Sequence, residues 1–233
     1  GTVAYRCRDA LMACVESVYA NTHMEFTWCL VDNYSKDGDV RFIESRFPQV
    51  VTIQNSDNRG STKGMNQAYS SRPSEFFLIL NPDTKVGPRA IDQMLSYLLA
   101  HSDVGAVGPR MLNSDGSPQI SARRYPTLTV TVLEIIGFNR WFPHNPSVVS
   151  YNYHDWDPVE TREVDWMSCS ALMVRSDIFD DIGGLDERYF MYSEEVDLCK
   201  EIHERGYKNI YLSHPYIYHE HAVSSRQNDV RQV

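Results

Sequence analysis

The 233 residues provide enough material for one large domain or two small ones, and their 42% hydrophobic and 23% charged content is ordinary for a soluble globular protein. The net charge of −9 argues against a nucleic-acid-binding protein that relies on a basic surface. Five cysteines without a C-x-x-C pair predict reduced thiols, and the lack of a long apolar run or signal peptide predicts a cytoplasmic protein, at most peripheral to a membrane.

Hydrophobic residues recur at helical and strand spacings in the first half of the chain. The pattern predicts helices at 9–20, 40–46, 62–70 and around 91–98, and strands at 26–31, 51–54, 76–80 and 104–107. Strands that alternate with helices imply a mostly parallel central sheet with right-handed crossovers. The sequence therefore predicts an α/β fold with helices flanking the sheet.

The strand at 76–80 consists of five apolar residues, too few for a helix core, and is expected to be buried on both faces. Pro82 follows it and resists continuing the sheet, so the chain should turn there. Asp83 then lies at the carboxyl end of a central strand, where open α/β sheets bind ligands. Asp32 ends the strand at 26–31 in the same way. Taken alone, each aspartate is explained better as a turn or cap residue.

The regular pattern ends between residues 113 and 160. Segments of this length without regular structure tend to be lids or binding loops, so a mobile segment is expected here. An apolar patch of Leu133, Ile135, Ile136 and Phe138 predicts a short amphipathic helix. Such a helix either packs on the sheet, which is the more ordinary arrangement, or lies against a membrane or lipid-like substrate.

The last third of the chain returns to a regular pattern. It predicts an apolar strand within 164–175, a turn at 182–186, and two short strands near 209–212 and 216–218. A helix is predicted to begin after Ser193, a favourable N-cap, and to end at Gly206.

Several familiar catalytic motifs are absent from the sequence. It contains no G-x-x-x-x-G-K-[ST] loop, no G-x-G-x-x-G after a strand, no G-x-S-x-G elbow and no H-E-x-x-H. The candidates that remain are acids and histidines at strand ends and helix starts.

Asp83 and His219 form the candidate metal site. An acidic protein that binds a polyphosphate needs a local cation, so metal and phosphate are expected together. Carboxylate oxygen and imidazole nitrogen suit Mn²⁺ or Mg²⁺ between diphosphate oxygens. His221 competes with His219 for this role. A lone histidine is more often a core or surface residue, so the interpretation requires Asp83 beside it.

Glu194 and Glu195 lie in the first turn of the predicted helix, where carboxylates favour the positive end of the helix dipole. Adjacent acids point in different directions, so one of them can still face a cleft as a general base. Trp166 is either a wall of a sugar site or a buried core indole.

Six short motifs occur in order along nearly the whole chain: Asp32-Asn33-Tyr34-Ser35, Asn58-Arg59-Gly60, Leu80-Asn81-Pro82-Asp83-Thr84, Asp165-Trp166, Gly183-Gly184-Leu185-Asp186-Glu187 and Tyr192-Ser193-Glu194-Glu195-Val196-Asp197-Leu198. Together they resemble the inverting family 2 glycosyltransferases. The nearest likeness is to rhamnosyltransferase-type enzymes of bacterial cell-surface polysaccharide synthesis.

The resemblance implies a single GT-A (Rossmann-like) domain over 1–233, with a nucleotide-binding half at 1–112 and an acceptor-binding half at 113–233. It implies metal-dependent transfer of a sugar, such as rhamnose, with inversion. The donor would be a dTDP- or UDP-sugar. The acceptor would be a glycan or, as 123–143 suggests, a lipid-linked glycan. Peripheral contact with the inner face of the plasma membrane is expected, and no nucleic-acid partner.

The resemblance also implies roles for individual residues. Asp32 would hold the nucleotide base, and further donor contacts would come from Asn33, Arg59, Gly60, Asn66 and Trp166. Asn81 and Asp83 stand where the family has its Asp-x-Asp metal motif, and His219 would complete the metal shell. Glu195 would be the general base that deprotonates the acceptor hydroxyl, with Glu194 beside it.

The chain departs from the family pattern in several places. Asn81 replaces a carboxylate, Glu195 replaces the usual aspartate, and Cys169 stands where glycine is common. The apolar first strand is reduced to residues 1–4. Two alternatives remain open: a nucleotidyltransferase that makes the sugar nucleotide, and a catalytically silent module that binds a sugar nucleotide or glycan.

Overall fold

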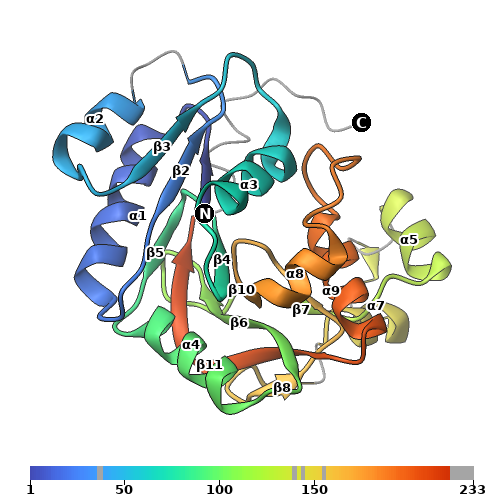
Figure 1. The fold of residues 1–233 in the computed structure, drawn as a ribbon. Helices are drawn as coiled ribbons and strands as arrows, with labels where there is room; N and C mark the ends of the chain where they lie inside the picture. The colour runs from blue at the N-terminus through green and yellow to red at the C-terminus, as the bar shows by residue number, and fades with distance from the viewer. Residues whose placement is uncertain (36–38, 138–140, 143–144, 154–155, 221–233) are drawn as a thin grey trace.

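The computed structural model describes residues 1–35, 39–137, 141–142, 145–153 and 156–220 (Figure 1). Two β-sheets form the centre. Sheet A is fully parallel, in the order β1-β2-β3, and contains β1 (Thr2–Ala4), β2 (Cys29–Asp32) and β3 (Val51–Gln54). All four residues of β2 are buried, which fits its continuous apolar run.

Sheet B follows the order β4-β10-β6-β11-β5, with β8 on the outside of β11. Its strands are β4 (Phe76–Leu80), β5 (Thr84–Val86), β6 (Val104–Leu112), β8 (Arg162–Glu163), β10 (Ala171–Arg175) and β11 (Lys208–His219). β6 and β11 are parallel, whereas β10 lies antiparallel between β4 and β6. Strands β4, β6 and β11 therefore share one direction, and β5, β8 and β10 run against it.

Backbone hydrogen bonds join the two sheets at β1 and β4. The Gly1 nitrogen donates to the Leu78 carbonyl at 2.8 Å, and the Leu80 N–H donates to the Gly1 carbonyl at 3.0 Å. This is the bonding pattern of a parallel pair. The carboxyl ends of β2 and β4 therefore meet at one edge, with Asp32 and the 81–83 turn on it. The expected α/β GT-A architecture is confirmed.

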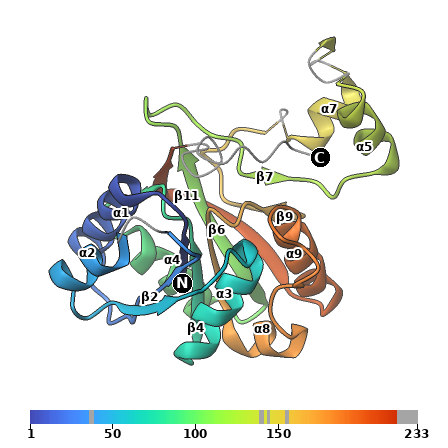
Figure 2. The same cartoon turned by 90° about the horizontal axis from the view of Figure 1, so that it is seen from above.

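Helices cover both faces of the sheets (Figure 2). One hydrophobic core lies under α1 (Arg8–Asn21), α2 (Asp39–Arg46) and α4 (Ala90–Ala100), and the other lies under α3 (Gly60–Ser71), α8 (Ser176–Ile182) and α9 (Glu194–Glu204). The buried face of α1 is the predicted set Leu11, Cys14, Val15 and Val18. The periodicity of the sequence therefore predicts most of the helices correctly.

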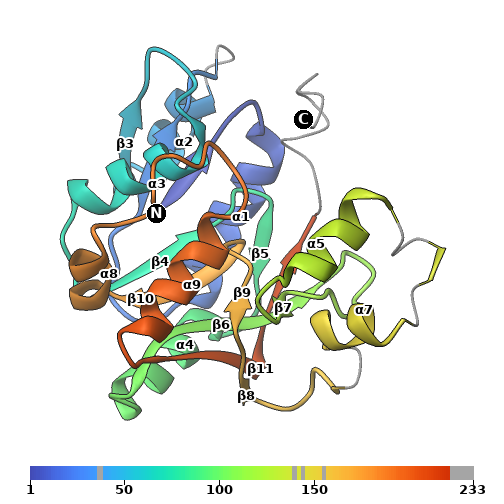
Figure 3. The ribbon, with the colours of Figure 1, turned by 90° about the vertical axis from the view of Figure 1, so that its right-hand side faces the viewer.

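The 113–160 segment contains more regular structure than expected. It includes β7 (Ala122–Arg123), α5 (Leu128–Ile135) and α7 (Pro146–Tyr151), and β7 pairs with β9 (Trp166–Met167). Figures 2 and 3 show α5 and α7 to one side of the sheets. Of the predicted apolar patch, Leu133 is half-buried and Ile136 is exposed; the side chain of Ile135 and all of Phe138 lie outside the described part of the chain.

Two local predictions need correction, and one helix was not predicted. The two short strands near 209–212 and 216–218 form one strand, β11, whose register shifts between Leu212 and Tyr216. Ser193 precedes α9 with a φ of 72°, and its side chain makes no capping bond. The sequence pattern does not predict helix α8, because seven residues are too few to show a clear period. Among the described residues, no helix is both long enough and apolar enough to cross a membrane.

Candidate active site

Asn33, directly after β2, joins two loops at the edge of sheet A. Its amide nitrogen donates to Asn58 Oδ1 and to the Gly60 carbonyl, both at 2.9 Å. Its amide oxygen accepts from Asn55 Nδ2 and from the Arg59 N–H, both at 3.1 Å. Both N–H donors and both acceptor positions of the Asn33 amide are therefore used, and the residue is only 2% exposed. Asn33 would contribute to a nucleotide site indirectly, by holding the loop at 58–60 in place.

Asp32 is 1% exposed, and its Oδ1 accepts the Ser35 N–H at 2.8 Å. This is the turn interaction that the sequence offered as the simpler alternative. Gln54 Nε2 lies 3.4 Å from the other carboxylate oxygen, Oδ2. The contact between Asp32 and a nucleotide base stays a prediction.

The turn at Gly60 packs against the loop before α9. Gly60 has a φ of +84°, and a Cβ atom there would clash with the Phe190 carbonyl oxygen. The Ser61 N–H donates to that same oxygen at 2.9 Å. Only glycine adopts this conformation without strain and also leaves space for the carbonyl. Gly60 therefore holds two loops in contact, and its predicted place along the nucleotide is untested.

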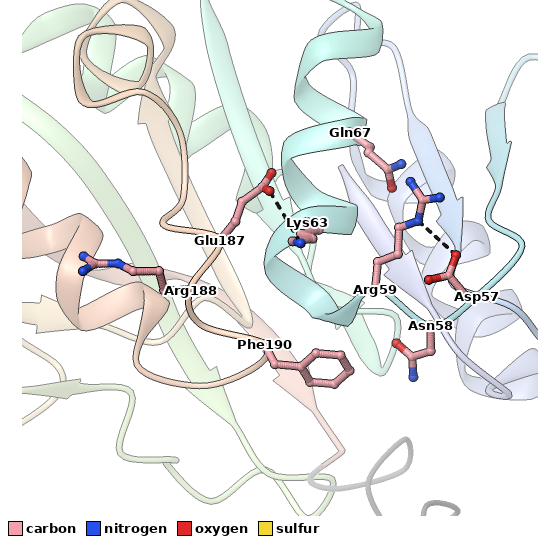
Figure 4. Close-up of a pocket in the computed structure, with 8 residues that line it drawn as sticks. All are labelled: Asp57, Asn58, Arg59, Lys63, Gln67, Glu187, Arg188 and Phe190. Atoms are coloured by element: carbon pink, nitrogen blue, oxygen red, sulfur yellow. Dashed lines mark hydrogen bonds and ion pairs between the residues drawn. The ribbon is translucent and has the colours of Figure 1, made fainter.

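Arg59 lines a polar cavity of 660 Å³ between α3 and the 187–190 loop (Figure 4). Its Nε is 3.2 Å from Asp57 Oδ1, and Lys63 Nζ is 4.0 Å from Glu187 Oε2 across the cavity. The lining residues are Asp57, Asn58, Arg59, Lys63, Gln67, Glu187, Arg188 and Phe190. Of the residues predicted to act in the site, Arg59 alone is in this set, so the cavity is separate from the acidic residues described below.

Asn66, on α3, bonds to the turn that follows α8. Its Nδ2 donates to the Leu185 carbonyl at 2.8 Å, and its Oδ1 accepts the Leu185 N–H at 2.9 Å. A Cβ atom at Gly184, where φ is +84°, would lie 2.9 Å from Asn66 Oδ1. Asn66 therefore fastens the 183–186 turn to α3, and its predicted contact with a nucleotide stays a prediction. This turn leads into the loop that precedes α9.

Asp83 and His219 lie together, as predicted. His219 ends β11 and pairs with Thr84 of β5, which places its Nε2 atom 3.3 Å from Asp83 Oδ1. The Glu220 N–H donates to the Asp83 carbonyl at 2.9 Å and holds the two segments in register. Both side chains are almost fully buried, at 9% and 8% exposed. His221, the competing candidate, lies outside the described residues.

The donor atoms of this pair fit a hard divalent cation. Two acceptor atoms that face each other at 3.3 Å need a cation between them, either a proton or a metal ion. Ligands of Mg²⁺ lie about 2.0–2.1 Å from the ion, so two of them can be up to about 4.2 Å apart. In the described residues no third His, Cys, Asp or Glu completes a cluster. Diphosphate oxygens and water would fill the other positions.

Asn81 holds the metal-motif turn against a second turn, at 168–170. Its N–H donates to the Ser170 carbonyl at 2.9 Å, and its Nδ2 lies 3.4 Å from Ser170 Oγ. The Asn81 carbonyl accepts Thr84 Oγ1 at 2.8 Å. The turn that carries Asp83 is therefore held to the 168–170 turn mainly by the backbone of Asn81, a bond that does not depend on the side chain at this position.

Glu194 and Glu195 begin α9 and have different environments. Ser61 Oγ donates to Glu194 Oε1 at 3.2 Å, so Glu194 is fastened to the start of α3. Among the described residues, the buried Oε2 atoms of both Glu194 and Glu195 have no hydrogen-bond partner, and for Glu195 no side-chain partner like Ser61 is seen. Burial, and then the charge of Glu194, raise the pKa of Glu195 to about 7. A carboxylate with this pKa is half ionised near neutral pH and suits a general base.

The 168–170 turn connects the two groups of acids. It is bonded to Asn81, as described above. Burial, and then the charges of Glu195 and Glu194, raise the pKa of the Cys169 thiol well above its usual value. The turn that precedes Asp83 is therefore bonded to a second turn that lies within electrostatic range of both glutamates. Cys169 occupies this turn as a buried, protonated thiol.

Trp166 is a core residue. It is 5% exposed, and its indole N–H donates to the Arg124 carbonyl at 2.7 Å. The Arg123 guanidinium lies 5.4 Å from the centre of the indole ring. Of the two alternatives that the sequence left open, the structure therefore supports the buried indole and not the open wall of a sugar site.

Comparison with known proteins identifies the family of this chain. A model of Glycosyl transferase family 2 matches residues 1–154, about two thirds of the chain. The N-acetylglucosaminyl-diphospho-decaprenol L-rhamnosyltransferase of Mycobacterium tuberculosis is 31% identical over 207 residues, which cover 84% of this chain and 67% of that protein.

This chain belongs to glycosyl transferase family 2.

Further relatives agree with this assignment. Rhamnosyltransferase WbbL of Escherichia coli is 28% identical to this glycosyltransferase over 153 residues, 64% of this chain and 53% of that protein. A crystal structure of GalNAc-T7 with UDP, GalNAc and Mn²⁺ matches with a TM-score of 0.69 at 13% identity. The mannosyltransferase PcManGT of Pyrobaculum calidifontis, in complex with GDP-Man and Mn²⁺, matches at 0.66 and 15%.

The coverage of these matches is unequal. The two solved structures cover 94% and 96% of this glycosyltransferase, which in turn spans 43% and 56% of their chains. At such low identity they show the shared fold. The family assignment favours a glycosyltransferase over the nucleotidyltransferase that the sequence left open.

Sequence analysis missed Arg123 of this family 2 enzyme as a site residue. Its positive charge lowers the pKa of Glu195, against the larger effects of burial and Glu194. Its Nε donates to Asn152 Oδ1 at 3.0 Å, which fixes the guanidinium. Arg123 pairs with Trp166 between β7 and β9, and this pairing between distant segments gives no local signal in the sequence.

Proposed function

We propose that this enzyme transfers a sugar from a nucleotide-diphosphate sugar to a hydroxyl group of a glycan or lipid-linked glycan, with inversion and with a bound divalent metal ion. The proposal is carried by the Asp83–His219 pair, which follows a turn bonded to the 168–170 turn, and by Glu195, whose pKa is raised and whose charge acts on Cys169 of that same turn. The names of the mycobacterial and Escherichia coli relatives support rhamnose as the sugar. The mycobacterial name supports a diphospho-polyprenol acceptor.

Glu195 acts as the base in this mechanism. Its carboxylate accepts the proton of the acceptor hydroxyl while that oxygen bonds to the anomeric carbon. The bond from that carbon to the diphosphate breaks on the opposite face, which inverts the configuration. Glu194 and burial keep Glu195 basic enough for this step, and Arg123 keeps a fraction ionised at neutral pH.

Asp83 and His219 would hold Mn²⁺ or Mg²⁺. The ion, when bound, neutralises charge on the departing diphosphate. Asn81 and the 168–170 turn keep Asp83 directed toward His219. Asp32, Arg59 and the loop held by Asn33 are the proposed contacts of the nucleotide.

A thermal-shift panel tests the donor. UDP-, dTDP- and GDP-sugars are each added with and without Mn²⁺, and a dTDP- or UDP-sugar is expected to raise the melting temperature only when Mn²⁺ is present. A ligand at 100 times its Kd stabilises the folded state by about 2.7 kcal/mol. Hydrolysis of the same donors is followed in parallel. Binding without hydrolysis or transfer would favour the catalytically silent module, and no shift with any donor would contradict the proposal.

Contact with a membrane is proposed at α5. Leu128 and Val132 lie four residues apart on one face of α5 and are 82% and 47% exposed. Ile136, directly after the helix, donates its N–H to the Val132 carbonyl and is 63% exposed. Trp141, beyond the helix, is 81% exposed. Apolar and aromatic residues of this kind suit a membrane interface.

Sedimentation with phospholipid vesicles tests this contact. Wild-type protein is expected to sediment with the vesicles, and the double variant Leu128→Glu/Val132→Glu is expected to remain in the supernatant. Leu99→Glu is the matched control, because Leu99 is 63% exposed on α4. Equal sedimentation of the double variant and the wild type would contradict the proposal.

A further inference from the structure

A second cavity, of 120 Å³, lies between the segment that joins β6 to β7, the loop after α7, and β11. The described residues that line it are all uncharged, and three of them are aromatic: Pro118, Gln119, Ile120, Ser121, Ala122, Asn152, Tyr153, Trp156, Pro158 and Tyr211. One water molecule needs about 10–15 Å³, and a pocket that encloses a whole ligand has at least about 300 Å³. The cavity therefore suits one substituent of a larger molecule.

Six of the lining side chains are polar, and four of these are hydrogen-bonded within the protein: Gln119, Asn152, Tyr153 and Tyr211. The other two are different. Trp156 Nε1 and Ser121 Oγ are buried and have no hydrogen-bond partner in the described part of the chain, and Ser121 is only 8% exposed. A buried polar atom without a partner is unfavourable. These two atoms therefore need partners from outside the protein, either water or a ligand.

The aromatic rings fix the position of the indole. The centre of the Trp156 ring lies 4.7 Å from that of Tyr211, with 86° between the ring planes, and 6.0 Å from that of Tyr153, with 77° between them. Edge-to-face contacts of this kind are favourable. The Arg162 guanidinium lies 5.3 Å from the centre of the indole ring. The position of the Trp156 N–H is therefore determined before any ligand binds.

These features determine the chemistry of the group that fits the cavity. An indole N–H can only donate, so Trp156 needs an acceptor such as a carbonyl oxygen. A hydroxyl group also accepts, so Ser121 can take the N–H of an amide. Uncharged walls with aromatic rings disfavour an ionised group and favour a methyl group. The acetamido substituent of an N-acetylated sugar has a carbonyl oxygen, an N–H and a methyl group.

Two residues of the cavity wall are bonded to the surroundings of the proposed base. The Ser121 carbonyl accepts the Ser168 N–H at 2.8 Å, in the 168–170 turn. Asn152 Oδ1 accepts Arg123 Nε at 3.0 Å, and the charge of Arg123 acts on Glu195. The proposed base acts on the acceptor hydroxyl, so a sugar substituent in this cavity is expected to belong to the acceptor.

We propose that the cavity binds the acetamido group of an N-acetylated acceptor sugar. Trp156 Nε1 donates to the carbonyl oxygen of this group, and the amide N–H of the group donates to Ser121 Oγ. Trp156 and Ser121 then determine which acceptor is used. The assignment to the acceptor rests on the proposed function. Binding of the acetamido group depends on the cavity alone and can be measured without donor or metal.

The experiment uses ¹⁵N-tryptophan-labelled protein and two-dimensional ¹H–¹⁵N NMR of the indole N–H groups. Methyl β-N-acetylglucosaminide is added, and methyl β-glucoside, with a hydroxyl in place of the acetamido group, is the matched probe. The Trp156 signal, assigned by its loss in Trp156→Phe, is expected to shift with the first glycoside and not with the second. The Trp28 signal is the internal control, since its N–H is already bonded to Thr2 Oγ1 at 3.1 Å.

Ser121→Ala tests the second contact. It is expected to weaken binding of methyl β-N-acetylglucosaminide about 3–10-fold, because one hydrogen bond is lost. The melting temperature should not fall, since the Ser121 hydroxyl has no partner within the described chain. Ser96→Ala, at an exposed position of α4, is the matched control.

Transfer assays test the assignment to the acceptor. The wild type is expected to prefer octyl β-N-acetylglucosaminide over octyl β-glucoside about 10–100-fold in kcat/KM. Ser121→Ala is expected to reduce this preference about 3–10-fold, with kcat/KM for octyl β-glucoside unchanged.

The outcomes separate this proposal from the proposed function. A Trp156 signal that shifts with neither glycoside, or equally with both, would overturn the proposed cavity. The expected shift without transfer from any donor would support the cavity and contradict the proposed function. Transfer with equal kcat/KM for the two octyl acceptors would overturn the assignment to the acceptor. Slower hydrolysis of UDP-N-acetylglucosamine in Ser121→Ala, with an unchanged acceptor preference, would place the acetamido group in the donor and also overturn it.

Discussion

The Glu195→Gln variant is expected to lose about 10³-fold in kcat for sugar transfer, with little change in the KM for the donor, because general-base catalysis contributes about 10²–10⁴-fold. Glutamine has the same shape as glutamate and cannot accept the proton of the acceptor hydroxyl. Steady-state kinetics with donor and acceptor varied separately measure both constants. The loss should appear in kcat, since Glu195 is proposed to act on the acceptor and not on the donor.

Glu204→Gln is the matched control, because Glu204 lies at the exposed end of the same helix, where it pairs with Lys200. Glu195→Asp, which restores the residue usual in the family, is expected to keep partial activity. Unchanged turnover in Glu195→Gln would show that the base is a different group, with Glu194 and Asp197 as the next candidates. Both are acids in the first turn of α9 with raised pKa values.

The same carboxyl group predicts a pH dependence. The pKa of Glu195 is about 7, so at lower pH the carboxyl group is protonated and cannot act as a base. The value of kcat/KM should therefore rise with pH through about 7 and then level off. Arg123→Gln removes a charge that lowers this pKa, so the midpoint should move to higher pH. A kcat/KM that does not rise with pH near 7, or a midpoint that moves to lower pH in Arg123→Gln, would contradict the assignment of Glu195 as the base.

Stability measurements separate catalysis from folding. The pKa of Glu195 is raised in the folded state, so the folded protein binds this proton more tightly than the unfolded chain does. The contribution of this group to the free energy of unfolding is therefore most favourable at acidic pH. It falls as the pH rises from about 4.5 to 7, and the loss is about 3 kcal/mol above pH 7. Glu195→Gln should accordingly unfold at a higher temperature than wild type at pH 8, while being inactive.

The Asp83→Asn variant is expected to lose about 10³-fold in kcat/KM and its response to Mn²⁺. The amide keeps the shape of the side chain and removes the negative charge that attracts the metal ion. A bound metal ion supplies several kcal/mol of charge stabilisation in the transition state, and this would be lost. Titration of activity with Mn²⁺ should show no saturation in the concentration range that saturates wild type. Titration calorimetry should show weaker Mn²⁺ binding in the absence of donor.

Asp103→Asn is the matched control for this loss, because Asp103 is an exposed aspartate whose partner is Lys208. Surface ion pairs of this kind contribute little to stability. Wild-type affinity for Mn²⁺ in Asp83→Asn would mean that the metal is held elsewhere, and the pair with His219 would then be an ordinary buried ion pair.

Much of the fold follows from local sequence pattern. The apolar run of β4 and the proline after it are enough to place Asp83 at the sheet edge. Helix α8 gives no such signal, since tertiary packing stabilises it: Phe179 is fully buried, with its ring centre 4.7 Å from Tyr69 and 5.5 Å from Phe77. Pattern analysis detects elements that carry their own period and misses those that depend on distant partners.

The site residues divide in the same way. The order of motifs and the expected sheet predict that Asp83 and His219 lie together, and the structure confirms their proximity. Asn66 bonds to Leu185, which lies 119 residues away, and no feature of the local sequence indicates that contact. The position of Trp166 has two explanations that spacing alone does not separate. Contacts between side chains of distant segments require the structure.

The contact between the start of α3 and the start of α9 has a consequence for the evolution of this enzyme. Ser61 donates to Glu194, and Phe190 packs against Gly60. The loop next to the proposed nucleotide contacts therefore also holds Glu194, the neighbour of the proposed general base Glu195. A substitution that adapts the 58–61 turn to another nucleotide therefore shifts the charge beside Glu195. Changes of donor in this lineage should arise together with compensating changes at 190–195, and a library built to alter donor choice should randomise both segments at once.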